Sequence, residues 1–308
     1  MRKDLISIFN LSSKEIWDLI VTARRLKSGK SFRPVLTGKS LGLIFEKPST
    51  RTTVSFAVAM YQLGGFPLVL DARNLQRKRG ETIPDTVRTL SRYLDAIMIR
   101  AFSHRDVEEF AEWATVPVIN GLTDTEHPCQ ILGDLLTICE KKRISTLSRL
   151  KNIKVAFIGD GNNMANSWIA AAGTLGFTFV LGRPKGYGPN LRILEKACKL
   201  GRSSGGRITV THNPEEAVKD ADVIYTDVWI SMGEEAERAK RMRAFKRFQV
   251  NAHLLRKAKR KCLVMHCLPA NRGEEITSDV IEGPQSIIFD QAENRLHIQK
   301  AILLKLLK

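Results

Sequence analysis

The stretch Phe45-Glu-Lys-Pro-Ser-Thr-Arg-Thr52 decides how the first half of the chain folds. It ends a short apolar run, breaks at Pro48 and restarts with residues typical of a helix start, so it predicts a strand that leads directly into a helix. The first turn of that helix would hold three hydroxyls and one guanidinium, on Ser49, Thr50, Arg51 and Thr52. Because a helix start has unpaired N–H groups and a partial positive charge, this turn predicts an anion site suited to phosphate. Helix capping alone would need only one of these residues.

Short apolar runs alternate with segments of helical period along the whole chain, which is the pattern of parallel α/β folds. In the first half the predicted strands are Ser40–Glu46, Phe66–Leu70, Ala96–Arg100 and Val116–Asn120. In the second half they are Lys154–Gly159, Phe177–Leu181, Ile208–Thr211, Val223–Asp227, Cys262–His266 and Ser286–Asp290. A basic, Ser-containing stretch at 141–151 follows an amphipathic helix and predicts a domain boundary near 145–150. We therefore expect two doubly wound domains, 1–145 and 146–290, each with a parallel central sheet flanked by helices, and a final helix at 294–308.

Composition bounds the class of protein. The 308 residues are 43% hydrophobic and 26% charged, which is typical of a soluble globular protein with room for two domains. No apolar run approaches the roughly 18 residues of a membrane span, and the N-terminal sequence is too polar for a signal peptide, so we expect a cytoplasmic protein. The five cysteines include no Cys-x-x-Cys pair, which argues against a disulfide framework and a structural zinc site.

The net charge of +17 allows two interpretations. One is nucleic-acid binding, and the other is a small acidic substrate on a generally basic protein. Eleven Lys or Arg residues lie between Arg238 and Lys261, interrupted by apolar residues at helical spacing. That spacing favours a solvated helix face over a nucleic-acid site.

Several polar clusters follow predicted strands of the first half, where α/β proteins place ligands. Gln76–Thr86 is a Gly-containing loop that leads into a helix. Arg100 ends an apolar strand, so it either marks the point where the strand reaches water or contacts a ligand. His127-Pro-Cys-Gln130 opens a helix, where a lone His is more often a cap or a surface residue than a ligand contact.

Three further clusters lie in the second half. Gly159–Ser167 partly matches the dinucleotide fingerprint, but two adjacent Asn residues replace its small residues and suit a carboxylate or amino-acid group better. Asp227–Glu235 offers an acid and a hydroxyl that suit an ammonium group, or is simply a strand end with a capped helix. His266-Cys-Leu-Pro269 also ends a strand. Metal binding by its first two residues is disfavoured, because adjacent residues of a strand face opposite ways.

The order of these motifs resembles the aspartate/ornithine carbamoyltransferase family over essentially the whole chain. The motifs are Ser-Thr-Arg-Thr, Arg100, His-Pro-x-Gln, Asp-Gly-Asn-Asn, Asp-x-Trp-x-Ser-Met-Gly and His-Cys-Leu-Pro. The last two resemble the ornithine-using members in particular. The resemblance implies two α/β domains, one for carbamoyl phosphate and one for ornithine, with the terminal helix (about 291–308) packing back on the first. It also implies a homotrimer or an assembly of trimers, with no metal or organic cofactor.

The resemblance also assigns roles to residues. The implied contacts of carbamoyl phosphate are Ser49, Thr50, Arg51, Thr52, Gln76 (from a neighbouring subunit), Arg100, His127, Gln130, Cys267, Leu268 and Arg295. The implied contacts of ornithine are Asn163, Asp227, Ser231 and Met232. The catalytic group within these sets would be Arg51, Arg100, His127 and Cys267. A loop at 231–233 that folds over ornithine predicts ordered binding, with carbamoyl phosphate first.

This sequence departs from the family pattern at three places. Thr53 and Ala57 replace a common Arg and Glu, which reads as the joint loss of a weak helix-surface ion pair. Arg77-Lys78-Arg79 replaces Leu-Gly-Arg in the loop after Gln76, and Asn271 stands where His is frequent. The alternatives are a carbamoyltransferase for a related amine or acylated ornithine, a dinucleotide-dependent dehydrogenase and a nucleic-acid-binding module. The sequence leaves open whether the enzyme would serve arginine synthesis or citrulline breakdown.

Overall fold

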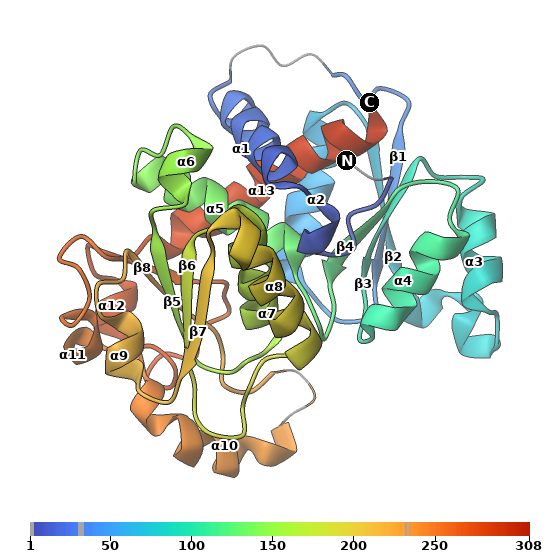
Figure 1. Cartoon of the computed structure of the whole chain (residues 1–308). Coiled ribbons are helices and arrows are strands. Elements are labelled where there is room, and N and C mark those ends of the chain that lie inside the picture. Colours follow the sequence, from blue (N-terminus) through green and yellow to red (C-terminus); the bar gives the residue numbers. More distant parts are fainter. Residues whose placement is uncertain (1–2, 30–33, 232, 234) are drawn as a thin grey trace. The chain divides into compact units, whose positions relative to one another are not determined.

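The computed structural model describes residues 3–29, 34–231, 233 and 235–308, and the chain forms two compact units (Figure 1). Unit 1 comprises Met1–Ile138 and Glu293–Lys308, and unit 2 comprises Cys139–Ala292. The two divisions fall inside helices α5 (Pro128–Lys141) and α13 (Ile288–Leu307). The end of the chain therefore returns to the unit that contains its beginning.

Unit 1 is built on a four-stranded parallel sheet in the order β2-β1-β3-β4. Its strands are β1 (Ser40–Phe45), β2 (Phe66–Asp71), β3 (Ala96–Arg100) and β4 (Val118–Leu122). The chain runs from β1 to β2 on one side and then crosses to β3 on the other, so the winding direction switches between β1 and β3. Phe45 and Arg100 are in register at the carboxyl ends of these two strands. Ligands of α/β proteins bind at such a switch point.

Helices cover both faces of this sheet. In addition to α5 and α13 they are α1 (Ser13–Lys27), α2 (Thr50–Gln62), α3 (Ile83–Leu90) and α4 (His104–Trp113), with short 3-10 turns η1 (Ile8–Asn10), η2 (Ala72–Asn74) and η3 (Gln76–Arg79). Val87 of α3 and Phe110 of α4 pack with Ile97 and Ile99 of β3 on one face. Figure 1 shows α2 on the opposite side of the sheet from α3 and α4.

Unit 2 is built on a five-stranded parallel sheet in the order β7-β6-β5-β8-β9. Its strands are β5 (Lys154–Ile158), β6 (Thr178–Gly182), β7 (Arg207–Thr211), β8 (Val223–Thr226) and β9 (Leu263–His266). The winding direction switches between β5 and β8. The segments that follow these two strands are therefore neighbours at one edge of the sheet.

The helices of unit 2 are α6 (Leu147–Leu150), α7 (Asn163–Leu175), α8 (Leu191–Ser204), α9 (Pro214–Val218), α10 (Arg238–Phe245), α11 (Ala252–Leu255) and α12 (Ser278–Ile281), with η4 (Glu235–Glu237) and η5 (Lys246–Phe248). Trp168 of α7 packs edge-on against Tyr225 of β8. Phe245 of α10 and Val264 of β9 belong to the core on the other face. Both faces of the sheet are thus buried, as the continuous apolar strands predict.

The predicted α/β class with two parallel sheets is confirmed, and nine of the ten predicted strands are present within two residues of their predicted bounds. The predicted strand Ser286–Asp290 is wrong. Ser286 makes only a single bridge to Val264, and α13 begins at Ile288, six residues before the predicted start of the final helix. Ile287 and Ile288 are buried, so a short apolar run that reads as a strand is the buried start of a helix.

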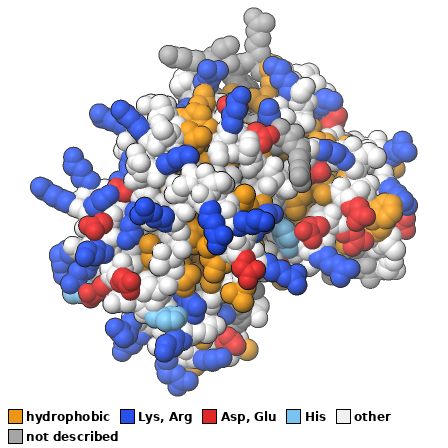
Figure 2. Space-filling model, in the orientation of Figure 1, with side chains coloured by type: hydrophobic (Ala, Val, Ile, Leu, Met, Phe, Trp, Pro, Cys, Tyr) orange, Lys and Arg blue, Asp and Glu red, His pale blue; other side chains and the backbone are white. Residues whose placement is uncertain are grey.

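The basic stretch 238–261 forms two short helices, α10 and α11, with η5 between them. Figure 2 shows Lys and Arg side chains interspersed with acidic ones over the visible face, which is the pattern of a generally basic surface. Within the described residues, no helix is both long and apolar enough to cross a membrane.

Candidate active site

The start of α2 is formed by a capped turn directly after β1. Ser49 has extended backbone angles, and its hydroxyl accepts a hydrogen bond from the Thr52 N–H at 3.3 Å. Thr50 is exposed and Arg51 is half-buried. This cap uses one of the first N–H groups of the helix and leaves the turn available for an anion, as the sequence predicts.

Three guanidinium groups of unit 1 converge on His127, which lies immediately before α5. The His127 side chain is buried, and burial is the main reason why its pKa lies well below the ordinary value. The positive charges of Arg295, Arg100 and Arg51 lower this pKa further. His127 is therefore a neutral imidazole within a strongly positive field, where it can donate one N–H to a ligand.

Lys47 adds a fourth cation to this group. It is only 9% exposed, and its ammonium lies 4.3 Å from the centre of the Phe102 ring. Burial lowers its pKa, and the charge of Arg100 lowers it further. The nearby carboxylates of Asp124 and Glu46 act in the opposite direction on this pKa and partly balance the charge of Lys47. The four cations still form a strongly positive group, which suits a multiply charged anion.

Arg295 joins the terminal helix α13 to the other two helices of this site. Its guanidinium donates to the Thr52 hydroxyl in α2 at 3.2 Å and to the side-chain oxygen of Gln130 in α5. Gln130 in turn donates to Asp134 at 2.8 Å. The structure thus brings together Thr52, Gln130 and Arg295, which are separated by as many as 243 positions in sequence.

Gln76 is placed differently from the other predicted residues of unit 1. It lies in η3, after the edge strand β2, and its side chain is exposed. In the described part of the chain, no hydrogen bond or ion pair joins it to Arg51, Arg100 or His127. The structure of one chain does not bring Gln76 into this group.

In unit 2 the carboxylate of Asp227 is held by three donors at the end of β8. The Asn162 amide donates to one oxygen at 2.8 Å, and the Cys267 thiol donates to the other at 2.9 Å. The N–H of Val228 donates to that second oxygen at 2.8 Å. Asp227 is 8% exposed, so this is a fixed, nearly buried negative charge that suits an ammonium group.

The other predicted site residues of unit 2 lie in the segments that follow β5, β8 and β9. Asn163 is the first residue of α7, and Asn162 caps that helix by accepting from two N–H groups. Ser231 is half-buried, whereas Met232 lies outside the described residues. Leu268 has a left-handed backbone (φ 58°), and its N–H donates to His266 at 2.8 Å.

The expectation that His266 and Cys267 face apart is wrong. Ligand atoms of Asp227, His266 and Cys267 all lie within 4.8 Å of one another, because β9 ends at His266 and the chain turns there. Both imidazole nitrogens are nevertheless engaged, one by the Leu268 N–H and the other by the buried carboxylate of Glu275 at 3.0 Å. The imidazole is thus committed to holding the loop rather than to a cation.

Two residues of these groups were missed by the sequence analysis. Lys47 lies inside the stretch that predicted the anion site, but Lys is so rarely buried that its type alone gives no signal. Asn162, rather than Asn163, holds Asp227. Two adjacent Asn residues fit the cap and the first helical position equally well, so only the structure distinguishes them.

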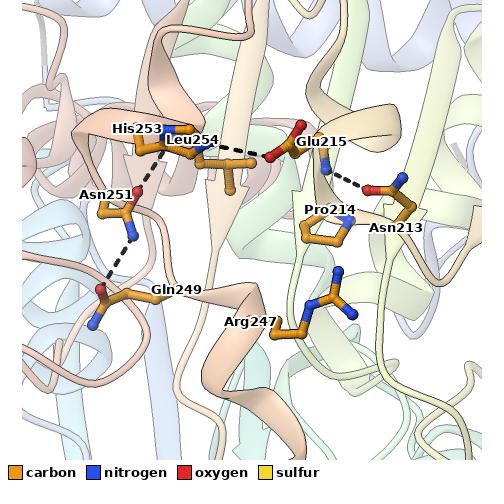
Figure 3. A pocket seen from close by; sticks show the side chains of 8 residues that line it. All are labelled: Asn213, Pro214, Glu215, Arg247, Gln249, Asn251, His253 and Leu254. Carbon is orange, nitrogen blue, oxygen red and sulfur yellow. Dashed lines mark hydrogen bonds and ion pairs between the residues drawn. The ribbon is translucent and has the colours of Figure 1, made fainter.

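An open pocket of about 350 Å³ lies elsewhere in unit 2, between α9 and α11 (Figure 3). Arg247 and Glu215 line it, and Glu215 interacts with His253 at 3.3 Å. None of the predicted site residues lines this pocket.

Comparison with known proteins gives matches over both units. The model of the aspartate/ornithine carbamoyltransferase carbamoyl-P binding domain matches residues 3–140, and the model of the Asp/Orn binding domain matches residues 151–306. The ornithine carbamoyltransferase of Syntrophus aciditrophicus is 53% identical over 98% of this chain and 99% of its own. The anabolic ornithine carbamoyltransferase of Pyrococcus furiosus is 52% identical over 98% of this chain and 95% of its own.

Solved structures show the same similarity. The ornithine carbamoyltransferase structure from Pyrococcus furiosus superposes with a TM-score of 0.92 at 53% identity, covering 97% of this chain and 95% of that one. The anabolic enzyme from Campylobacter jejuni gives a TM-score of 0.93 at 39% identity, covering 98% of each chain. The resemblance predicted from the motifs is confirmed.

Proposed function

The chain belongs to the aspartate/ornithine carbamoyltransferase family, and from this premise we propose that it transfers the carbamoyl group of carbamoyl phosphate to the δ-amine of L-ornithine, releasing citrulline and phosphate. The single observation that best supports the first substrate is the convergence of Arg51, Arg100 and Arg295 on a buried, neutral His127. Such a field suits a phosphate dianion attached to a carbonyl group.

On the side of carbamoyl phosphate, the proposed contacts divide between phosphate and carbonyl. The start of α2 and Arg51 would bind the phosphate oxygens, because helix N–H groups and a guanidinium fork both suit a tetrahedral anion. Arg100 and the neutral N–H of His127 would stabilise the negative charge that develops on the carbonyl oxygen. Donors that are fixed before the reaction do this without reorganising, which makes them effective catalysts.

On the side of the acceptor, Asp227 supports ornithine over aspartate. Its carboxylate is held by Asn162, Cys267 and a backbone N–H, so its charge is fixed at the end of β8. A cationic amino acid would be attracted there, whereas a dicarboxylic one would be repelled. We propose that Asp227 and Cys267 bind the amino groups of ornithine, and that Asn163, Ser231 and Met232 complete its site.

The attack requires a neutral amine, although a free alkyl amine has a pKa near 10. Ornithine must therefore lose a proton before or during the attack of its δ-nitrogen on the carbamoyl carbon. The thiol of Cys267 donates to the carboxylate of Asp227, so in this proposal the thiol orients the amine and the carboxylate receives its proton. The tetrahedral intermediate then expels phosphate, and the reaction as proposed uses no metal or organic cofactor.

Self-association is part of the proposal, as a homotrimer or an assembly of trimers. The edge strand β2 exposes Phe66 (64%) and Val69 (50%), and α2 beside it exposes Tyr61 (75%). An unpaired edge strand with apolar side chains favours an interface between chains. Since Gln76 follows this edge, a neighbouring chain could receive its side chain.

Two further parts of the proposal rest on less specific observations. A cytoplasmic location is proposed from the sequence pattern. The arginine-synthesis direction is proposed because the similar Pyrococcus furiosus protein is named as anabolic.

The test is formation of the carbamoylated product from carbamoyl phosphate with a panel of acceptors: L-ornithine (which gives citrulline), N-acetyl-L-ornithine, putrescine and L-aspartate. The proposal expects ornithine to have the highest kcat/KM by a wide margin. If N-acetylornithine or putrescine is preferred, the related-amine alternative replaces it. Product formation from none of the four would contradict the proposed reaction.

A further inference from the structure

One buried guanidinium in unit 2 bonds the turn after β5, the segment after β8 and a carboxylate at the start of its own helix. Arg241 of α10 is 6% exposed. Its Nη1 donates to Asp160 at 2.7 Å and to the carbonyl oxygen of Trp229 at 3.0 Å, and its Nε donates to Glu237 at 3.2 Å. The guanidinium also lies over the ring of Tyr187, 5.1 Å from its centre. Arg241 is therefore buried and bonded, unlike the solvated basic side chains expected for the stretch 238–261.

The first of these segments is the turn from β5 to α7. Asp160 lies two residues before Asn162, which holds Asp227. The turn packs directly against the backbone of Gly188, since a Cβ added at Gly161 would lie 2.2 Å from its carbonyl carbon, and the Gly161 N–H donates to the Tyr187 carbonyl oxygen at 3.2 Å. The carboxylate of Asp160 is thus a fixed point beside the proposed acceptor site.

The other two contacts lie at the two ends of one loop. Trp229 is the second residue after Asp227, and Glu237 is the last residue of η4. Ser231 and Met232, both proposed to contact ornithine, lie between them in sequence. The Trp229 ring also stacks on Phe245 of α10, with ring centres 5.8 Å apart. Arg241 therefore joins the segment after β8 to the turn after β5, whereas its bond to Glu237 is a local contact at the start of its own helix.

The chemistry of the contact requires arginine in particular. A guanidinium presents several N–H donors in one rigid plane, so it can serve two carboxylates and a carbonyl at once. A lysine at this position would keep the charge but would supply it at a single point. The buried carboxylate of Asp160 also needs a cation beside it.

We propose that Arg241 is a positioning residue for the amino-acid acceptor. By holding Asp160 and Trp229 together, it sets the path of the segment that leads from Asp227 to Ser231 relative to Asn162. This inference rests on the proposed function, because it assigns the acceptor as the ligand of that loop. Its loss should weaken the use of ornithine much more than the use of carbamoyl phosphate, since all the implied carbamoyl phosphate contacts except Cys267 and Leu268 lie in unit 1.

The experiment compares Arg241→Lys with Arg243→Lys, the same substitution at an exposed position of the same helix. Steady-state citrulline formation gives kcat and a KM for each substrate. The expected result for Arg241→Lys is an ornithine KM raised about tenfold or more, because small displacements of positioning groups have large effects. The KM for carbamoyl phosphate should stay within about twofold of the wild type, and Arg243→Lys should match the wild type in all constants. Asp160→Asn provides the same comparison if Arg241→Lys does not fold.

Equal rises of the ornithine KM and the carbamoyl phosphate KM in Arg241→Lys would overturn the inference. An unchanged ornithine KM in both Arg241→Lys and Asp160→Asn would also overturn it. A second readout separates this outcome from failure of the proposed function. Without any substrate, backbone amides of residues 228–237 should exchange with deuterium faster in Arg241→Lys than in the wild type and in Arg243→Lys. Equal exchange in all three proteins would overturn the positioning role, whether or not the wild type forms citrulline. A wild type that forms no citrulline would contradict the proposed function but not, by itself, the positioning role.

Discussion

The thiol of Cys267 donates a hydrogen bond to the carboxylate of Asp227 at 2.9 Å, although the two residues are 40 positions apart. The register of the sheet accounts for this contact. Thr226 of β8 pairs with His266 of β9, so the next residue of each strand emerges at the same edge. Two adjacent parallel strands thus place an acid and a thiol side by side without any need for a special loop.

This contact makes a prediction about the role of the thiol. Cys267→Ser keeps a donor at the same place, so we expect it to retain activity within about tenfold and to keep the same dependence of kcat/KM on pH. Cys267→Ala removes the donor and should raise the KM for ornithine further than the Ser variant does. The measurement is turnover between pH 6 and about 10, a range that includes the usual pKa of a thiol. A shifted alkaline limb in Cys267→Ser would show instead that the thiol titrates during catalysis.

The start of α2 makes a prediction about rate. Removing Arg51 takes away a fixed donor to a group whose charge grows in the transition state, and one such donor is typically worth about 3–4 kcal/mol. Arg51→Ala should therefore lower kcat by about a hundredfold or more. Arg105→Ala, at an exposed position of α4, is the matched control and should not change kcat. A fall of less than about tenfold in Arg51→Ala would be too small for the proposed role.

The neutral state of His127 makes a prediction about stability and pH. In the folded protein its pKa is held well below the usual value by burial and by Arg295, Arg100 and Arg51, whereas in the unfolded chain the pKa is near 6.5. Below about pH 6.5 the unfolded chain therefore binds a proton that the folded protein does not, and the free energy of unfolding falls as the pH falls.

Denaturant unfolding at pH 7 and pH 5 measures this effect. The decrease in unfolding free energy between the two values should be smaller in His127→Gln than in the wild type, because the variant lacks the group that takes up the proton. If His127→Gln shows an undiminished decrease, the imidazole is not held neutral by its surroundings.

The exposed edge of β2 makes a prediction about assembly. A carboxylate placed in an apolar interface must lose its hydration, so Phe66→Asp should break the proposed self-association. Light scattering coupled to size-exclusion chromatography should give the mass of three chains or a multiple of three for the wild type, and a lower mass for Phe66→Asp. Leu191→Asp, at an exposed position of α8, should behave as the wild type does. A wild type that elutes as a single chain would exclude this interface.

Much of the fold could be predicted because parallel α/β proteins repeat a simple pattern. The run Ala96–Arg100 predicts a buried strand, and the structure has that strand with the same bounds. The segment 286–290 fails for a physical reason, since its short apolar run (287–289) can be buried either as a strand or as the first turn of a helix. The helix α13 begins there, and a single bridge to Val264 is what remains of the predicted pairing.

The site residues also divide into those that the sequence could predict and those that it could not. Motifs that stand directly after a strand, such as the turn after Phe45, could be placed from sequence because the sheet edge fixes where they lie. The roles of Lys47 and Arg241 could not, because both are ordinary basic residues in sequence and their burial arises from packing between distant segments. Asn162 was one residue away from the predicted Asn163, and a shift of one position is beyond what helix patterns resolve.

The central claim is that the phosphate of the first substrate binds at the start of α2, and a crystal structure tests it most directly. The protein would be crystallised with a bisubstrate analogue in which a phosphonoacetyl group is joined to the δ-nitrogen of ornithine. The account predicts that the phosphonate contacts the Arg51 guanidinium and the first N–H groups of α2, with the amino-acid end against Asp227. A phosphonate bound away from residues 49–52 would contradict the account.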